Sequence, residues 1–210
     1  MPVTLMGYAQ AAIRTVAVGA LVLLGLGGCA STPAPLAAMP PMVEVAAWGG
    51  TTTAPPAQAQ RITRITLHHQ GENFAPNSDV AAYLRRLQLW SRLTKRWADI
   101  PYHYVIAPDG RIYTARPLSI PGDTNTEYQP QGHALVMLMG NLEETQPAPA
   151  QLESAVALVA ALAARHGLGV DAIASHKDFS TQTLCPGKHL YRHLESGWFQ
   201  RQVAHRLSQP

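Results

Sequence analysis

The chain has 210 residues, of which 47% are hydrophobic and 14% charged, and its formal net charge is +3 with histidines neutral. This length can bury a proper hydrophobic core within one domain. The excess of positive charge is too small to indicate a nucleic-acid-binding protein, so no nucleic-acid partner is expected.

Residues 1–28 have the pattern of an export signal. A single arginine precedes the apolar residues 16–26, a stretch shorter than the ~20 apolar residues that a membrane-spanning helix needs. The sequence LGGC at 26–29 resembles the lipobox of bacterial lipoproteins. The resemblance implies a cleaved signal peptide, lipidation of Cys29 and, with Ala30 next, the periplasmic face of an outer membrane. An uncleaved anchor and a plain signal peptide are the alternatives.

Residues 29–60 comprise the cysteine to be lipidated and a stretch rich in Pro, Ala, Thr and Gly that is nearly free of charge. Such a composition buries too little apolar surface to order itself, so it predicts a flexible tether. The short run 43–48, ending at Trp48, is the exception that could dock on the domain. The domain itself is expected over residues 61–210.

The first elements of this domain follow from periodicity. Residues 61–69 (RITRITLHH) alternate apolar and polar side chains and predict a strand. A helix capped by Asn77 or Ser78 is then expected to run to about Trp97, with its apolar residues near one face.

A hairpin and a buried strand come next. Residues 104–106 and 111–113 flank an Asp-Gly turn, which is a strong hairpin signal. The long polar loop at 114–133 is of a length that is usually functional. The continuous apolar run HALVMLMGN (133–141) predicts a strand buried on both faces.

The last part of the chain alternates helices with a loop of polar residues. A helix over 151–166 is stopped by Gly167, and the residues DAIASH (171–176) predict a short strand leading to His176. A final helix is expected from about residue 188 or 191 to the C-terminus. The order of elements predicts a single-domain α/β fold, with a mixed central β-sheet flanked by helices.

Cys185 is one of only two cysteines, and it lies in the polar loop SHKDFSTQTLCPG. If Cys29 carries lipid, Cys185 has no partner within the chain. An intermolecular bridge, a reactive thiol and a metal ligand are then the open explanations, and an intramolecular disulfide is the weakest. Zinc accepts histidine nitrogen and cysteine thiolate, so a site with His68 and His176 fits this chemistry, although the spacing alone is a weak signal.

Four motifs occur in order between Arg61 and Leu194: ITLHHQG, DIPYHYVIAPDGRIYTARP, HALVMLMGN and SHKDFSTQTLCPG. Together they resemble the N-acetylmuramoyl-L-alanine amidases of the type 2 amidase superfamily, which includes phage lysozyme-type amidases and peptidoglycan recognition proteins. The resemblance implies a zinc-dependent hydrolase that cuts the amide between N-acetylmuramic acid and L-alanine in peptidoglycan or muropeptides.

The resemblance also assigns roles to single residues. The metal ligands match His68, His176 and Cys185, and His69 is the runner-up for the first ligand. Tyr102 matches a hydroxyl that positions water or stabilises the oxyanion, because a free tyrosine with a pKa of about 10 is a poor base.

Thr183 matches an oxyanion donor, in the pattern of the catalytic recognition proteins. The family's usual small residues after the first histidines are Gln70 and Gly71 here, and the entry to the buried strand also differs. His103, His133 and Lys177 are weaker candidates for contacts with the substrate. The tryptophans outside the tether are expected to pack within the fold, namely Trp90, Trp97 and Trp198.

Three functions therefore compete. The first is the zinc amidase, acting as a monomer anchored through Cys29. The second is a non-catalytic peptidoglycan-binding lipoprotein, which the complete set of site residues disfavours. The third is a cysteine hydrolase with Cys185 as nucleophile and a histidine as base. Zinc content and sensitivity to chelators separate the first from the other two.

Overall fold

A six-stranded mixed sheet forms the centre of the computed structural model, which describes residues 1–3, 38–75 and 78–209. The strand order is β1–β4–β3–β5–β2–β6, and the pairing is parallel except between β3 and β4. The strands are β1 (Met42–Val43), β2 (Arg64–His69), β3 (Tyr104–Ile106), β4 (Ile112–Thr114), β5 (His133–Leu138) and β6 (Ile173–Ser175).

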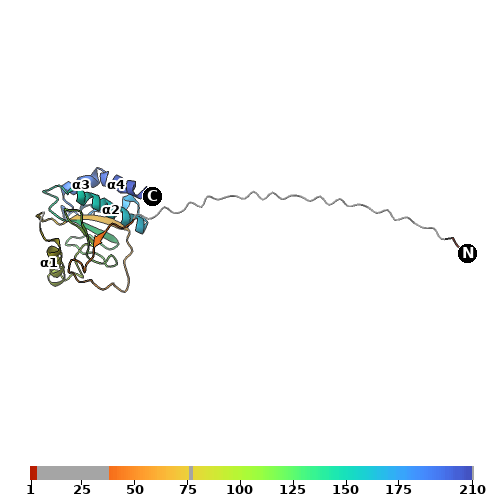
Figure 1. Ribbon diagram of the computed structural model, residues 1–210, viewed down its shortest axis with the longest axis horizontal. Coiled ribbons are helices and arrows are strands. Elements are labelled where there is room, and N and C mark those ends of the chain that lie inside the picture. The colour runs from red at the N-terminus through yellow and green to blue at the C-terminus, as the bar shows by residue number, and fades with distance from the viewer. Residues whose placement is uncertain (4–37, 76–77, 210) are drawn as a thin grey trace. The chain divides into compact units, whose positions relative to one another are not determined.

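Helices cover both faces of this sheet (Figure 1). One face packs against the last three α-helices in a core of aliphatic side chains, and the other packs against α1. The predicted α/β class is thereby confirmed. The helices are α1 (Val80–Leu93), α2 (Pro149–His166), α3 (Lys188–Glu195) and α4 (Trp198–Leu207), with 3-10 turns η1 (Val170–Ala172) and η2 (His176–Asp178).

Two helices end earlier than their sequence patterns predict. The N-cap of α1 is Asp79, whose side chain accepts a hydrogen bond from the Ala82 N–H, and the helix stops at Leu93 instead of near Trp97. Arg96 takes a left-handed φ of 60°, which no helix can continue. The expected C-terminal helix is divided into α3 and α4 at Gly197, whose φ of 69° breaks it in the same way.

The segment expected to be a tether is packed on the domain over part of its length. Met42 and Val43 form β1, which pairs with β4 at the edge of the sheet. Trp48 is buried, and its indole N–H donates to the Thr114 carbonyl at 2.8 Å. The run 43–48, which was expected to be the exception, does dock on the domain. The hydrogen bonds to the domain continue beyond it as far as Thr53, whose hydroxyl donates to Asp99.

The signal-peptide, lipobox and Cys29 predictions lie outside the described residues. Within the part of the chain that is described, none of the helices combines the length and the apolar character needed to cross a bilayer.

Candidate metal centre

The alternation of side chains along β2 directs His68 to the α1 face of the sheet. Ile65 and Leu67 join the core beneath α2, so Thr66 and His68 point the other way. β6 runs parallel to β2 and ends at Ser175, so that His176 follows at the same edge. The carboxyl ends of parallel strands are a common place for binding sites, and two histidines meet there.

Cys185 reaches this edge from a loop that is tied down at both ends. Its carbonyl accepts from the Lys177 N–H at 2.8 Å, and its own N–H donates to Thr183 Oγ1 at 3.0 Å. Gly187 lies so close to the backbone of Leu142, on another loop, that a Cβ on Gly187 would lie 2.3 Å from the Leu142 carbonyl carbon. The Pro186-Gly187 sequence after the cysteine thus permits the close contact that places the thiol.

His68, His176 and Cys185 converge as predicted. One ligand atom from each lies within 4.8 Å of the others, and all three residues are buried. The rings of His68 and His176 are 4.8 Å apart between centroids, and His68 Nδ1 is 3.5 Å from Cys185 Sγ. Bonds of about 2.0–2.3 Å to one zinc ion need ligand atoms within about 4 Å, so side-chain shifts of less than about 1 Å would complete such a site.

Electrostatics favour the same interpretation. Burial, followed by the nearby charge of His176, holds the pKa of His68 well below its usual value, and burial lowers the pKa of His176 as well. Both imidazoles are therefore neutral near pH 7 and offer lone pairs. His68 Nε2 is buried with no hydrogen-bond partner among the described residues, an unpaired polar atom of the kind found at functional sites.

The Cys185 thiol is free, buried and not activated by its surroundings. Burial raises its pKa to about 12, against a smaller opposing effect of the hydrogen bond from the His69 N–H to Sγ. Nucleophilic cysteines have lowered pKa values instead. A bound cation is the ordinary way to make such a buried thiol a thiolate.

His69, the alternative first ligand, is engaged elsewhere. Its Nδ1 accepts a hydrogen bond from the Leu142 N–H at 3.1 Å, and its ring lies outside the cluster. Successive residues of a strand face opposite ways, which explains why only one of the two neighbouring histidines reaches Cys185.

Hydroxyl groups from the loop after β4 hold the ring of His176. Thr126 Oγ1 lies 2.8 Å from His176 Nε2, and Thr124 Oγ1 lies 3.4 Å from the same nitrogen. Histidine ligands of metals usually bind a second group through their other nitrogen, which fixes the tautomer and the ring orientation. The two threonines supply this kind of contact to His176.

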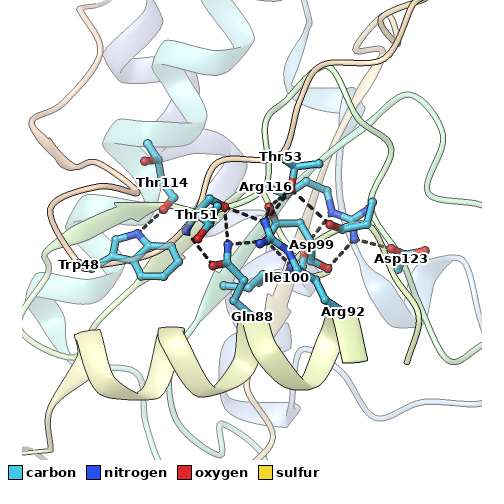
Figure 2. A network of polar contacts seen from close by, with 11 residues as sticks. Trp48, Thr51, Thr53, Gln88, Arg92, Asp99, Ile100, Thr114, Arg116 and Asp123 are labelled. Atoms are coloured by element: carbon cyan, nitrogen blue, oxygen red, sulfur yellow. Dashed lines mark hydrogen bonds and ion pairs between the residues drawn. The ribbon is translucent and has the colours of Figure 1, made fainter. Parts of the chain in front are cut away.

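The base of that loop is fixed by Arg116, which is buried (Figure 2). Its guanidinium donates to the Ile100 and Asp99 carbonyls, both at 2.7 Å, and also to the Pro121 carbonyl and the Asp123 carboxylate. The Arg116 guanidinium therefore joins the loop that follows α1 to the segment that carries Thr124 and Thr126.

Asp99 extends the same network toward the N-terminal segment. It is fully buried and accepts hydrogen bonds from Gln88 at 2.8 Å and from Arg92 at 2.9 Å, both on α1, and from Thr53. The Gln88 side chain in turn bonds both the N–H and the carbonyl of Thr51 (Figure 2). The network thus binds α1 to the segment that precedes the domain.

A cavity of about 480 Å³ opens over the cluster, a size typical of ligand pockets. Tyr102 and Thr183 both line it, and the Tyr102 ring is 5.1 Å from that of His68 between centroids. Burial raises the pKa of Tyr102 well above its usual value, so its hydroxyl keeps its proton. The Thr183 hydroxyl accepts the Cys185 N–H, as a turn residue would, while its own proton stays available.

Three residues suggested as substrate contacts lie outside this cavity. His103 is buried, with Nδ1 accepting from the Leu135 N–H and Nε2 against the Ile120 carbonyl. His133 is also buried, and its Nδ1 lies 2.8 Å from Thr66 Oγ1. The Lys177 ammonium lies over the Tyr191 ring at 4.2 Å. None of the three is among the residues that line the cavity, and their predicted contacts with substrate stay predictions.

Other residues in and around the site escaped the sequence patterns. Thr126 lines the cavity and Arg116 lies before the same loop, which has no periodicity and where hydroxyl and cationic residues are ordinary. Trp90 and Trp97 were expected to pack within the fold, yet both line the cavity and Trp90 is 44% exposed. Only Trp90 lies on α1, and Trp97 follows the end of that helix, so their spacing of seven residues gives no helical signal for the pair.

The comparisons with known proteins agree with this arrangement. The sequence profile described as N-acetylmuramoyl-L-alanine amidase matches residues 58–188. Peptidoglycan recognition protein 1 of Mus musculus is 27% identical over 135 residues, which are 63% of this chain and 73% of that protein. Peptidoglycan-recognition protein SC2 of Drosophila simulans is 24% identical over 184 residues, 85% of this chain and 97% of the relative.

Solved structures share the fold. The endolysin N-acetylmuramoyl-L-alanine amidase LysCS from Clostridium intestinale is 26% identical, with a TM-score of 0.59 over 77% of this chain and 97% of that chain. Drosophila peptidoglycan recognition protein SD is 25% identical, with a TM-score of 0.63 over 74% of this chain and 93% of its own.

Proposed function

This chain belongs to the N-acetylmuramoyl-L-alanine amidase family, and on that premise we propose that it is a zinc-dependent amidase. The bond cut is the amide between N-acetylmuramic acid and L-alanine in peptidoglycan or its soluble fragments. The observation that carries the proposal is the convergence of His68, His176 and Cys185 beneath a cavity of ligand size.

The chemistry divides between a metal and the side chains around it. When bound, zinc supplies a Lewis acid that polarises a carbonyl and lowers the pKa of water to about 7. The protein's own part is to hold two neutral imidazoles and a thiolate on rigid elements. Burial keeps both histidines unprotonated, and the Thr126 hydroxyl orients the ring of His176.

Tyr102 and Thr183 act as hydrogen-bond donors. The raised pKa of Tyr102 suits a hydroxyl that donates to the oxyanion or orients water, and does not suit a general base. Loss of one oxyanion donor typically raises the barrier by about 2.7–4 kcal/mol, so a Thr183→Val variant retains slow turnover. Loss of His176 would abolish turnover by removing a ligand.

The decisive experiment is digestion of purified muropeptides with and without EDTA, read by mass spectrometry. The amidase separates sugar from peptide at the lactyl–alanine bond, loses activity in EDTA and regains it with zinc. Binding of muropeptides without any cleavage would favour the non-catalytic alternative instead. Retained cleavage in EDTA would favour a thiol nucleophile.

A Cys185→Asp variant gives a second separation of these mechanisms. Aspartate oxygen can replace the thiolate as a zinc ligand, whereas it cannot act as the thiol nucleophile of a cysteine hydrolase. Zinc-dependent cleavage by this variant supports the amidase, and complete loss of cleavage with zinc still bound argues against it.

We also propose that the protein is anchored in the cell envelope through lipid on Cys29, on the periplasmic face of the outer membrane. The support is the sequence LGGC at 26–29 after an apolar stretch of signal length. Metabolic labelling with a fatty acid, followed by membrane fractionation, tests this. A Cys29→Ser variant loses both the label and the membrane fraction, and a variant that keeps either one contradicts the proposal.

A further inference from the structure

The solvent-facing side of α1 carries apolar side chains that the fold does not cover. Leu89 is 59% exposed and Leu93 is 64% exposed, one helical turn apart on the same side of α1, and neither lines the cavity. Trp90 is also exposed but lines the cavity, so it belongs to the site already described. Among residues 38–75 and 78–209, Leu184 is the only other large apolar side chain that is exposed. Exposed apolar surface is therefore concentrated on α1.

Cationic side chains surround the two leucines. Residues 80–98 contain five cations and no acidic residue. Within the described part of the chain, Arg92 alone among the five has an ion-pair partner, Asp99 at 2.9 Å. The other four leave their positive charge to solvent beside the leucines. We call these four cations together with Leu89 and Leu93 the outer face of α1; the cations are Arg85, Arg86, Lys95 and Arg96.

The spacing along the helix mixes the two kinds of side chain on one side. Arg85, Leu89 and Leu93 follow one another at intervals of four residues, and Arg86 precedes Leu93 by seven, so all four lie on the same side of α1. Val80, Leu84 and Gln88 are buried on the opposite side, against the sheet and the N-terminal segment. The outer face is thus a second amphipathic surface of a helix whose core side is already satisfied.

A bilayer suits this surface better than the other candidate partners. Leucine side chains enter the boundary between headgroups and acyl chains, while the long arginine and lysine side chains reach back to anionic phosphates. A second copy of the chain would bring cations against cations. A soluble polyanion would pair with the cations and leave the leucines in water. Both components of the outer face find partners only at an anionic lipid surface.

We propose that the outer face of α1 docks on a bilayer of anionic phospholipid. The proposal goes beyond the amidase activity, because it concerns where the cavity is held and not the chemistry within it. The proposed lipid on Cys29 would assist the docking. Ala38, where the described domain begins, is nine positions after Cys29, so the chain between them spans at most about 32 Å. So short a connection gives the outer face a high effective concentration at the same leaflet.

The expected strength follows from the charges. Each Lys or Arg near an anionic leaflet strengthens binding about fivefold, so four such residues give a preference of about 600-fold over a neutral bilayer. The preference weakens with salt, because ions screen the attraction between exposed charges. Dependence on lipid charge and on salt therefore distinguishes docking of the outer face from retention by a lipid anchor alone.

The three lysines of the chain allow a test without any added label. Lys95 belongs to the outer face. Lys188 begins α3, which packs on the opposite side of the sheet from α1 (Figure 1), and Lys177 lies over the Tyr191 ring. A bilayer on the outer face covers Lys95 and leaves Lys177 and Lys188 as internal controls.

Acylation of the lysines measures the docking directly. The full chain is reconstituted in vesicles of phosphatidylcholine, alone or mixed with phosphatidylglycerol, and treated with a water-soluble amine-acylating reagent. Peptide mass spectrometry gives the rate at each lysine. Lys95 is expected to react about fivefold or more slowly on the anionic vesicles, with Lys177 and Lys188 unchanged. Raising NaCl to about 1 M is expected to remove most of the difference, because the Debye length falls to about 3 Å.

Matched variants assign the effect to the outer face. Arg86→Gln and Leu93→Gln are each expected to lower the NaCl concentration at which Lys95 becomes reactive, and combining both with Leu89→Gln is expected to abolish its protection. Arg201→Gln removes one positive charge from α4, on the other side of the sheet, and is expected to behave as the wild type. None of these residues lines the cavity, so cleavage of muropeptides in detergent is expected to stay unchanged.

Three outcomes overturn the docking. Equal acylation of Lys95 on neutral and anionic vesicles would show that the outer face does not meet the bilayer. Protection of Lys95 in detergent, rising with protein concentration, would assign the face to contact between copies of the chain. An equal effect of Arg201→Gln and Arg86→Gln would show attraction through overall charge, without a defined face.

Failure of the other proposals is visible separately. If Cys29 carries no lipid but Lys95 is protected on anionic vesicles, the anchor proposal fails and the docking stands. If Cys29 is lipidated and Lys95 reacts equally on both kinds of vesicle, the docking fails and the anchor stands. Cleavage of muropeptides in detergent decides the amidase proposal independently of both.

Discussion

At the scale of single residues, the ring of His176 depends on a hydroxyl group that a sequence motif does not reveal. Thr126 lies in a loop 50 residues earlier in the chain, and its Oγ1 is 2.8 Å from His176 Nε2. Groups that orient a metal ligand through its second nitrogen commonly change metal affinity 10–100-fold when they are lost.

A Thr126→Val substitution keeps the shape of the side chain and removes this hydroxyl. Zinc affinity, measured by competition with a chromogenic chelator, is expected to fall about 10-fold or more. Thr124→Val is the matched control and is expected to have a smaller effect, because its oxygen lies 3.4 Å from the same nitrogen. Equal affinities for wild type and Thr126→Val would contradict the role given to this residue.

His103 makes folding stability depend on pH. Burial lowers its pKa to about 4, with a further lowering by the charge of Arg116 and an opposing effect of the Ile120 carbonyl. Its Nδ1 accepts from the Leu135 N–H, so protonation at that nitrogen would break a buried hydrogen bond. The neutral ring is therefore the form that the folded protein favours.

Because the folded pKa lies below the unfolded value of about 6.5, the stability contributed by His103 is complete above pH 6.5. It is lost as the pH falls toward 4, by at most about 3 kcal/mol. A His103→Gln side chain can make both hydrogen bonds without titrating. Denaturant unfolding at pH 7 and pH 4.5 is expected to show a smaller loss of free energy in this variant, and an identical loss would rule out the assignment.

At the scale of elements, the segment before the domain serves as a brace for α1. Trp48 fills a space between the sheet and α1, Arg85 donates to the Trp48 carbonyl at 2.8 Å, and Gln88 bonds Thr51. The same helix carries three of the residues that line the cavity. The position of that side of the cavity therefore depends on a segment outside the domain boundary drawn from composition.

Replacing Trp48 by alanine removes the largest buried side chain of this segment. The free energy of unfolding is expected to fall by about 3–5 kcal/mol in denaturant titrations, as for other large-to-small core substitutions. Leu89→Ala, at an exposed position of α1, is expected to change it by no more than about 0.5 kcal/mol. A loss below about 1 kcal/mol for Trp48→Ala would mean that the segment is not part of the folded core.

Elements with strong local signals were predictable, and those set by distant contacts were not. α2 has continuous apolar periodicity and a stop at Gly167, and the structure places it at Pro149–His166. β1 is only two residues long and exists because β4 offers a free edge. The chain cannot continue α1 past Arg96 because the backbone of that residue has a left-handed φ, and no glycine or proline in the sequence predicts this conformation.

The residues of the site and of its surroundings show the same division. His68, His176 and Cys185 stood in recognisable motifs, and the structure brings them together. Arg116 could not be assigned because its partners come from two other loops. Trp90 could not be assigned because helical periodicity gives a face, and does not say whether that face meets the core or a cavity.

At the scale of the whole molecule, one ion would join three separate parts of the chain. His68 is the last residue but one of β2, His176 begins η2, and Cys185 lies in the loop before α3. Ligands that bind only the folded state stabilise it, by about 4 kcal/mol when zinc is present at 1,000 times its dissociation constant.

Calorimetric melting with zinc and with EDTA measures this linkage. For a chain of this size the midpoint is expected to rise by about 8–16 °C with zinc. A Cys185→Ala variant is expected to respond much less, because the site then lacks its thiolate. Equal responses of the variant and the wild type would show that zinc stabilises the protein somewhere else.

The sheet's two borders carry a further consequence. The outermost strands, β1 and β6, have only two and three residues. Such short edge strands expose few unpaired backbone N–H and carbonyl groups. Another copy of the chain therefore has little edge to pair with, which disfavours the growth of fibrils even when copies are densely packed.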